Sequence, residues 1–476
     1  MINYIVAIDL GTSCIKGIIG TRSLTGAFTV IACETESSAG CIRRGVIYNV
    51  ADATQRVTML IRKLANKAPG IQIKKVYVGV GGQSVRAIDH VVAKSLGADG
   101  EVKKETTDAL YEECRTFKPE GLEVLSITSP AFFLDGNREI DPVGIPCSRI
   151  EAHYKLIVCR PSLKLRIYTV AERARIEIAG LFVSPLALAD VVLSGIDKEL
   201  GCALLDFGAG TASLTIFRNK QLASLCTVPL GSRLITKDLT ILNVVETEAE
   251  RLKKAYGDAM ADKENDSPVQ VNGLNGAAPR LIKSSEINDV LKARLQEIAE
   301  NVYARLKEAG GADKLNAGII ITGGGASLKN FDAAVRERFG TTIRYASVNR
   351  TLFEKTNVAL EPEYGIVAGL LLKGTVNCSL QPAPAPAPPA PTPAPAPPAT
   401  PKDEDEVTKT ETPKAPKAPE QPAGRPKGGK GKGKKFMSGL VNFANNLFDD
   451  SDYEEDDAPE DEAKKKDTNN INKPQE

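Results

Sequence analysis

The sequence predicts an α/β fold made of two duplicated domains with a ligand held between them. Residues 4–19 are typical of a buried strand, an Asp-x-Gly turn and a second apolar strand, and residues 204–217 repeat that order. A third glycine turn follows the apolar strand at residues 319–321. A single turn of this kind is typical of any β-hairpin, but three strand-ending glycine turns in one chain are far more specific.

The first turn carries groups that suit a phosphate. Gly11 permits a tight turn and close approach of the backbone. The hydroxyls of Thr12 and Ser13 face the turn, and Lys16 supplies positive charge. Asp9 stands where a carboxylate can hold Mg²⁺ through water. Without its later repeats, an ordinary hairpin would explain this segment equally well.

The overall composition excludes several classes of function. The 476 residues suffice for two or more domains, and 61 basic against 60 acidic residues give no signal for nucleic-acid binding. Nine scattered cysteines and two histidines, with no C-x-x-C pair, argue against zinc and favour a reduced, cytoplasmic protein. We expect no signal peptide, because the N-terminus has no basic region and Asp9 interrupts its apolar run. We expect no membrane-spanning helix, because no apolar run reaches eighteen residues.

The order of predicted elements supports a two-domain body with an insertion. We expect a helix from about 50 to 67, a buried strand at 76–80 and a helix at 162–176 followed by a strand at 181–184. The block between them predicts a strand at 84–93, a helix at 106–117 and strands at 123–134 and 150–160. Residues 240–301 predict helices around a polar loop at 261–280, and later helices are expected at 328–338 and 363–373.

The C-terminal part differs in composition. Residues 381–401 are Pro/Ala/Thr repeats, which favour an extended chain of roughly 60 Å, and charged, disordered sequence follows to about 435. Residues 436–448 then form an apolar helical stripe behind a basic run, the pattern of an interfacial membrane anchor. A helix that fills a groove on a partner protein remains the alternative. The anchor residues would be Phe436, Met437, Leu440, Phe443, Leu447 and Phe448, with Lys434 and Lys435 before them.

These three glycine turns resemble those of the actin, sugar-kinase and DnaK-type ATPase superfamily. The segment Glu250-x-x-Lys253 is similar to the adenosine-contacting helix of bacterial actins, and residues 228–239 resemble the segment after their second hairpin. The block at 83–165 sits where the FtsA family carries its subdomain 1C, and a C-terminal amphipathic helix on a tether is also a feature of that family. The sequence departs from the family at Ala209, in its long Pro-rich linker and in the acidic tail after the anchor.

The resemblance implies an actin-like ATPase fold: two duplicated RNase-H-like domains around a nucleotide cleft, with an FtsA-type 1C insertion and a disordered C-terminal tail that carries an amphipathic helix. The implied boundaries are 1–82 and 166–200 for domain 1A, 83–165 for the SHS2-like 1C, 201–239 and 302–378 for 2A, 240–301 for 2B, 379–435 for the linker, 436–448 for the anchor and 449–476 for the acidic tail.

It also implies ATP and Mg²⁺ as ligands. The phosphate-binding residues would be Asp9, Gly11, Thr12, Ser13, Lys16, Asp206, Gly208, Gly210, Thr211 and Gly231, with Asp9 and Asp206 holding Mg²⁺ through water. The adenosine-binding residues would be Glu250, Lys253, Gly323, Gly324, Gly325 and Ser327.

The partners that the resemblance implies belong to cell division. They are the C-terminal peptide of the tubulin-like protein FtsZ, an anionic membrane surface, further copies in a filament and other divisome proteins. The peptide would dock on 2B, where the helix that carries Arg294 offers a face, and the alternative for Arg294 is a solvated surface charge. The implied location is the cytoplasmic face of the inner membrane at the septum.

Turnover of ATP is expected to be slow or absent. Hydrolytic relatives take a Gln or Glu from the segment after the last strand of the first domain, whereas residues 181–190 offer only Ser184 and Asp190. Other functions stay open: a PilM-like assembly ATPase, which would lack the membrane helix, and a sugar kinase, for which no catalytic Asp stands out. A DnaK-type chaperone would need a β-rich domain after 377, and the Pro-rich tail there excludes that function.

Overall fold

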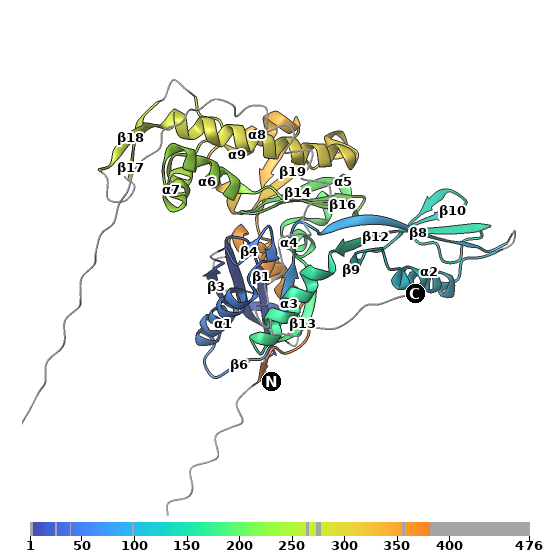
Figure 1. Ribbon diagram of the computed structural model, residues 1–476. Helices are drawn as coiled ribbons and strands as arrows, with labels where there is room; N and C mark the ends of the chain where they lie inside the picture. The colour runs from blue at the N-terminus through green and yellow to red at the C-terminus, as the bar shows by residue number, and fades with distance from the viewer. Residues whose placement is uncertain are drawn as a thin grey trace, which may run out of the picture. The chain divides into compact units, whose positions relative to one another are not determined.

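The computed structural model describes residues 3–380, apart from 24–25, 39, 98–99, 263–265, 273–277, 355–357 and 359. The described residues form three five-stranded sheets with helices against them (Figure 1). The predicted linker begins at 379, but residues 379–380 form a strand of the body instead. The rest of the linker, the amphipathic helix and the acidic tail lie outside the described residues.

The first sheet has the strand order β13-β7-β1-β2-β3. Its strands are β1 (Asn3–Leu10), β2 (Cys14–Arg22), β3 (Phe28–Ser37), β7 (Lys75–Val80) and β13 (Glu177–Val183). Its helices are α1 (Val50–Lys67), α3 (Pro161–Arg173) and α4 (Ser184–Val192), with β4 (Ile42–Arg43) and β5 (Val46–Ile47) as a short hairpin. The next helix, α5 (Gly195–Leu200), contacts the second sheet instead. These strands and helices confirm the elements predicted at 50–67, 76–80 and 162–176, within a few residues.

Helix α1 shows why the chain folds this way locally. The side chain of Asn49 caps the helix by accepting a hydrogen bond from the backbone N–H of Asp52. The buried residues recur at helical spacing, and they face β2 and β3. They are Ala53, Val57, Leu60 and Leu64.

The second sheet repeats the first with the order β16-β15-β14-β19-β20. Its strands are β14 (Cys202–Phe207), β15 (Ala212–Arg218), β16 (Gln221–Val228), β19 (Ile319–Thr322) and β20 (Ile343–Tyr345). In each sheet three antiparallel strands are followed by two parallel ones, so β1 and β14 hold the same central place. The predicted duplicated α/β fold is therefore confirmed.

Helices of the second half cover its sheet and build a small additional lobe (Figure 1). They are α6 (Ser232–Leu239), α7 (Glu246–Tyr256), α8 (Ser284–Glu308) and α9 (Phe331–Phe339), with short 3₁₀ turns η1 (Thr240–Leu242), η4 (Ala312–Lys314) and η5 (Gly324–Ser327). The 3₁₀ turns η6 (Arg350–Leu352) and η7 (Pro362–Tyr364) lead to α10 (Gly365–Leu372), which packs against α4, β1 and β2 of the first half. Within the predicted polar loop at 261–280, the structure instead has the hairpin of β17 (Pro268–Val271) and β18 (Arg280–Lys283). Its buried residues Val269, Val271 and Ile282 alternate with exposed ones, which is a short signal among polar neighbours.

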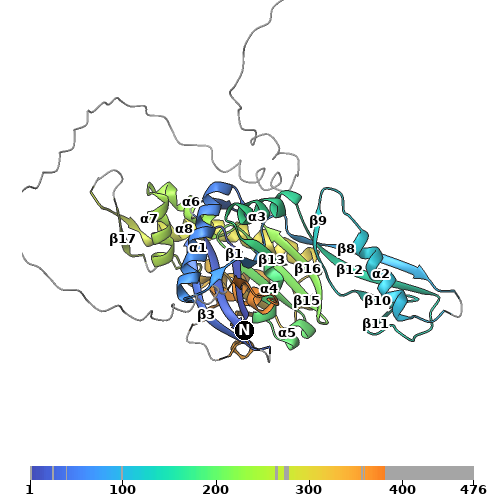
Figure 2. The same cartoon turned by 90° about the horizontal axis from the view of Figure 1, so that it is seen from below.

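The inserted subdomain is a separate lobe beside the second sheet (Figures 1 and 2). It contains β8 (Arg86–Ser95), α2 (Lys104–Thr116), β9 (Glu123–Ile127), β10 (Ala131–Leu134), β11 (Asn137–Glu139) and β12 (Arg149–Cys159). The single strand predicted at 123–134 is wrong, because β9 and β10 pair with different parts of β12. Pro130, which has no N–H to donate, stands between them.

The last described residues are tied to the first half. Strand β21 (Ser379–Leu380) pairs with β6 (Gln72–Ile73), and the backbone N–H of Cys378 donates to the carbonyl of Tyr4. The hydroxyl of Tyr77, a buried residue of β7, accepts hydrogen bonds from the backbone N–H groups of Thr375 and Val376 at 2.9 and 2.8 Å. The chain therefore leaves the described body at the edge of the first half.

Replacing Tyr77 by Phe tests this attachment. The variant Tyr77→Phe removes the acceptor of both N–H groups while it keeps the ring, so we expect the free energy of unfolding to fall by about 1–2 kcal/mol in urea titrations. Tyr48→Phe is the matched control, because Tyr48 is exposed. Equal stabilities of the two variants would show that the attachment contributes nothing.

Candidate functional site

Each half of the body places an aspartate at the end of its central strand. Asp9 pairs with Lys16 across β1 and β2, and its parallel neighbour on β7 is Gly79. In the same way, Asp206 pairs with Ser213 across β14 and β15. The carboxyl ends of the parallel strands thus bring both carboxylates to the edge where the two halves meet.

The two hairpin turns touch one another. A Cβ added to Gly210 would lie 2.5 Å from the hydroxyl oxygen of Thr12, so only glycine fits at this contact. Thr12 is itself fixed, since its hydroxyl accepts the backbone N–H of Gly45 at 3.0 Å. Gly11 is equally crowded, because its Cβ would lie 2.6 Å from the carbonyl oxygen of Cys14. The predicted glycines therefore allow the two turns to meet tip to tip.

The two carboxylates face different surroundings. Burial raises the pKa of Asp9, while a hydrogen bond from the Ser184 hydroxyl at 3.1 Å and the charge of Lys16 oppose that rise. Burial and the nearby charge of Asp9 raise the pKa of Asp206 to about 6, against the pull of Lys16. The site thus gathers two negative groups that repel one another, and a divalent cation would relieve that repulsion.

Lys16 is hydrogen-bonded to η7, while its charge also acts on Asp9 and Asp206. Its Nζ donates to the backbone carbonyl of Glu363 at 2.7 Å and lies 3.5 Å from the carboxylate of the same residue. The ammonium also lies 5.3 Å from the ring centroid of Tyr364. The structure therefore places this predicted phosphate ligand against η7, which the sequence pattern did not predict.

The third glycine turn packs against the second hairpin. Gly323 follows β19 with a φ of +90°, and a Cβ there would lie 2.5 Å from Asp206 Oδ1. Gly325 lies against the ring of Phe207. Gly324 and Ser327 are exposed, and nothing lies within 4 Å of the place where a Cβ on Gly324 would stand. The turn is thus packed against the second hairpin at Gly323 and Gly325 and is open at Gly324.

Helix α6 holds the second hairpin from behind. The backbone N–H groups of Ser232 and Arg233 donate to the carbonyls of Gly208 and Ala209, each at 2.9 Å, and the Gly208 N–H donates to the carbonyl of Thr211. A Cβ on Gly231 would lie 2.5 Å from the carbonyl of Ala209. Ala209 has no positive φ, so the departure from the family at this position causes no backbone strain.

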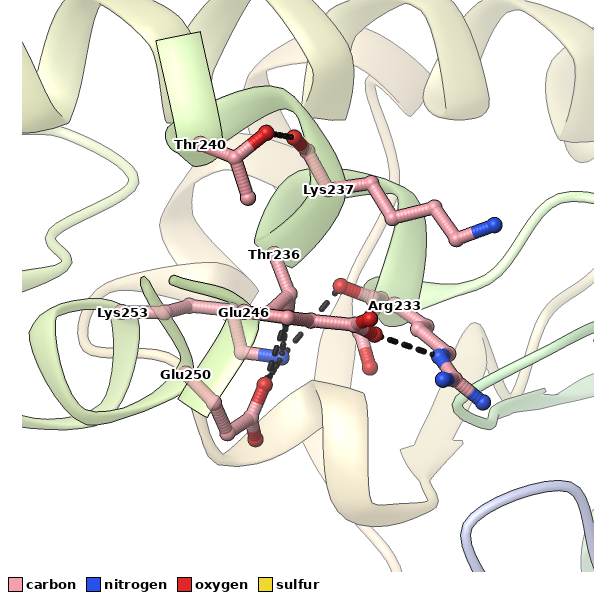
Figure 3. A network of polar contacts seen from close by, with 8 residues as sticks. Arg233, Thr236, Lys237, Thr240, Glu246, Glu250 and Lys253 are labelled. Atoms are coloured by element: carbon pink, nitrogen blue, oxygen red, sulfur yellow. Dashed lines mark hydrogen bonds and ion pairs between the residues drawn. The ribbon is translucent and has the colours of Figure 1, made fainter. Parts of the chain in front are cut away.

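The predicted adenosine residues of α7 contact each other. The buried ammonium of Lys253 lies 2.8 Å from Thr236 Oγ1 and 2.6 Å from Glu250 Oε2. Figure 3 shows these side chains pointing toward one another. Burial lowers the pKa of Lys253, and the pair with Glu250 opposes that shift. Arg233 and Glu246 form a second ion pair nearby at 2.8 Å (Figure 3). A contact of Glu250 and Lys253 with adenosine stays a prediction.

Arg294 is not a free surface charge. Its guanidinium pairs with Asp238 of α6 and with Glu297 one turn along α8, and its side chain is only 19% exposed. These carboxylates help to keep its pKa raised against the effect of burial. The structure therefore gives Arg294 a role in joining two helices, and it leaves the predicted contact with a peptide untested.

Asp190 is occupied in a comparable way. It pairs with Lys198 at 3.0 Å and with Lys373 at 2.7 Å, so its pKa is lowered although burial acts in the opposite direction. Asp190 is therefore an ion-paired residue on the surface of α4.

No helix in the described ranges combines the length and the apolar character that crossing a bilayer requires.

Two family profiles match this chain. One, described as "SHS2 domain inserted in FTSA", matches residues 82–158, and the other, described as "Cell division protein FtsA", matches residues 203–369. Among solved structures, a chain of a PilM-PilN type IV pilus biogenesis complex superposes with a TM-score of 0.55 and 15% identity, covering 78% of this chain and 98% of that one. The fold is thus actin-like, with an SHS2 insertion.

Curated relatives narrow the class. The cell division protein FtsA of Porphyromonas gingivalis is 32% identical over 376 residues, which is 78% of each chain. FtsA of Bacillus subtilis is 28% identical over 382 residues, or 79% of this chain and 84% of that one. The chain belongs to the FtsA family of cell division proteins.

Proposed function

We propose that this protein binds ATP with Mg²⁺ in the cleft between its halves and links FtsZ filaments to the cytoplasmic membrane during division. The observation that carries the nucleotide part is the meeting of two glycine turns beside the carboxylates of Asp9 and Asp206. Membership of the FtsA family supports the role in division.

The residues of the cleft fit a nucleotide with a cation. Mg²⁺ is commonly held by one or two carboxylates together with phosphate oxygens and water, and Asp9 and Asp206 are two such carboxylates. The hairpin turns offer backbone N–H groups and the hydroxyls of Thr12, Ser13 and Thr211 to phosphates. The third glycine turn offers an open side for adenosine. The bound cation would neutralise charge on the phosphates.

Slow or absent hydrolysis fits the residues near Asp9. Ser184 donates its hydroxyl to Asp9, and the two lysine partners of Asp190 occupy that carboxylate. Neither residue is placed as a general base for water. In this proposal the nucleotide mainly holds the two halves together, and its binding favours assembly into filaments.

Subdomain 2B offers an apolar surface for the C-terminal peptide of FtsZ. Ile241 and Leu281 are each 69% exposed, and Val245 between η1 and α7 is 52% exposed. The side chain of Arg280, next to Leu281, donates to the carbonyl of Leu242, so these segments lie side by side. Apolar side chains gathered in this way suit a short peptide better than the internally paired Arg294 does.

The membrane part rests on residues outside the described ranges. The apolar stripe at 436–448 and its basic neighbours suit an anionic membrane surface, and each basic residue adds about 1 kcal/mol there. One short helix binds reversibly, so attachment at the septum would require several copies in a filament. Other divisome proteins would join through the same assembly.

The cleft can be tested at the contact between the hairpins. Gly210→Ala pushes a methyl group against Thr12, so we expect ATP affinity measured by calorimetry to fall at least about tenfold. Gly195→Ala is the matched control, because nothing lies near the position of its Cβ. Unchanged affinity in Gly210→Ala would contradict a nucleotide held between the turns.

The peptide site can be tested with one charge. In Leu281→Glu, a carboxylate replaces an exposed apolar contact, and we expect the affinity for a fluorescent FtsZ tail peptide to fall about tenfold or more by anisotropy. Ile196→Glu on α5 is the control, since Ile196 is also 69% exposed but belongs to another part of the body. Equal binding by both variants would place the peptide elsewhere.

The membrane link can be tested by deleting residues 436–448. We expect the shortened protein to bind ATP and the FtsZ tail as before, because the body is retained, but to stay in the supernatant when anionic liposomes are sedimented. FtsZ filaments should then sediment with the liposomes only when the full chain is present. Continued sedimentation of the deletion variant would contradict the proposed anchor.

A further inference from the structure

The two halves of the cleft differ in how they hold their carboxylates. Asp9 accepts a hydrogen bond from the Ser184 hydroxyl, which reaches it past Gly79, the neighbour of Asp9 on the parallel strand. Within the described residues, no hydrogen bond or ion pair reaches the carboxylate of Asp206. Its neighbour on the parallel strand is Thr322 instead of a glycine.

Thr322 carries a hydroxyl with no partner. The residue is 4% exposed, and its Oγ1 is a buried side-chain oxygen without a hydrogen bond. Buried polar groups are nearly always bonded, so such an atom calls for an explanation. Residues paired in register on neighbouring strands point to the same face of a sheet, which puts the side chains of Thr322 and Asp206 next to each other. The backbone at Gly323, the next residue, passes close to Asp206 Oδ1.

The other hydroxyl beside Asp206 has a partner. Ser213 lies opposite Asp206 on β15, and its Oγ is 3.5 Å from Thr227 Oγ1 on β16. Of the two hydroxyl residues that flank Asp206 on neighbouring strands, Ser213 therefore has a hydrogen-bond partner and Thr322 has none.

We propose that Thr322 is a positioning residue for Asp206, resting on the proposed binding of ATP with Mg²⁺. Its hydroxyl donates to the Asp206 carboxylate when the cation and the phosphates engage that carboxylate. Thr322 then does for the second half what Ser184 does for the first. A carboxylate that holds a cation through water is best oriented when its remaining lone pairs are bonded.

Two variants distinguish the effect of the Thr322 hydroxyl from the effect of side-chain volume. Thr322→Val has nearly the same volume but no hydroxyl, and Thr322→Ser keeps the hydroxyl. We expect Thr322→Val to weaken ATP binding about tenfold in calorimetry with Mg²⁺ and less than twofold in EDTA. Thr322→Ser should recover affinity to within about threefold of the original chain. Thermal unfolding of both variants shows whether they fold.

A double-mutant cycle makes the assignment specific to Asp206. In an Asp206→Asn background, Thr322→Val should change Mg²⁺-dependent affinity less than twofold, because the group it positions is gone. Equal losses with and without Mg²⁺, or additive effects in the cycle, would overturn the proposal while ATP binding itself stands. If Thr322→Val fails to fold, Thr322→Ala takes its place. The proposal then requires that Thr322→Ala lose Mg²⁺-dependent ATP affinity and that Thr322→Ser keep it. Failure of the original chain to bind ATP at all would overturn the proposed function, and this inference with it.

Discussion

The structure depends on one electrostatic constraint: two partly buried carboxylates, Asp9 and Asp206, lie at the contact between its halves. Burial raises the pKa of both groups, and the charge of Asp9 raises that of Asp206 further. When both carboxyl groups are charged they repel one another, and that repulsion opposes closure of the cleft. A divalent cation between them would turn this repulsion into attraction. In the proposed function, a bound cation would therefore couple closure of the two halves to the ligand by charge.

Steric fit adds a second condition to that contact. Gly210 meets Thr12, and Gly323 passes beside Asp206, in each case with too little space for a Cβ. Because interiors are packed to crystal density, such contacts are either made or broken and do not deform gradually. The halves are nevertheless unequal. Asp9 is already oriented by Ser184, whereas Asp206 has no partner among the described residues, so the second half has more to gain from a ligand.

Local patterns in the sequence predicted the hairpins, α1 and the duplication, because each depends on residues close together in the chain. The contacts that tune the site depend on distant residues. Ser184 reaches Asp9 across 175 positions and Lys16 reaches Glu363 across 347. The spacing of apolar residues along the sequence does not predict contacts between residues so far apart. The interpretation of Arg294 was incomplete for the same reason, since its partner Asp238 lies on another helix. The hairpin of β17 and β18 was missed because four-residue strands give too few alternations among polar residues.

Strand β1 connects the two parts of the proposed function. At its beginning, the carbonyl of Tyr4 receives the N–H of Cys378, where the chain leaves the described body. Five residues later, roughly 17 Å along an extended strand, stands Asp9. The neighbouring β7 repeats this arrangement, since Tyr77 holds residues 375 and 376 and Gly79 adjoins Asp9. A pull on the chain end would thus be resisted by the two strands that carry the first half of the cleft. Because those strands are central in their sheet, such a load would be shared with the core and not borne by a loop.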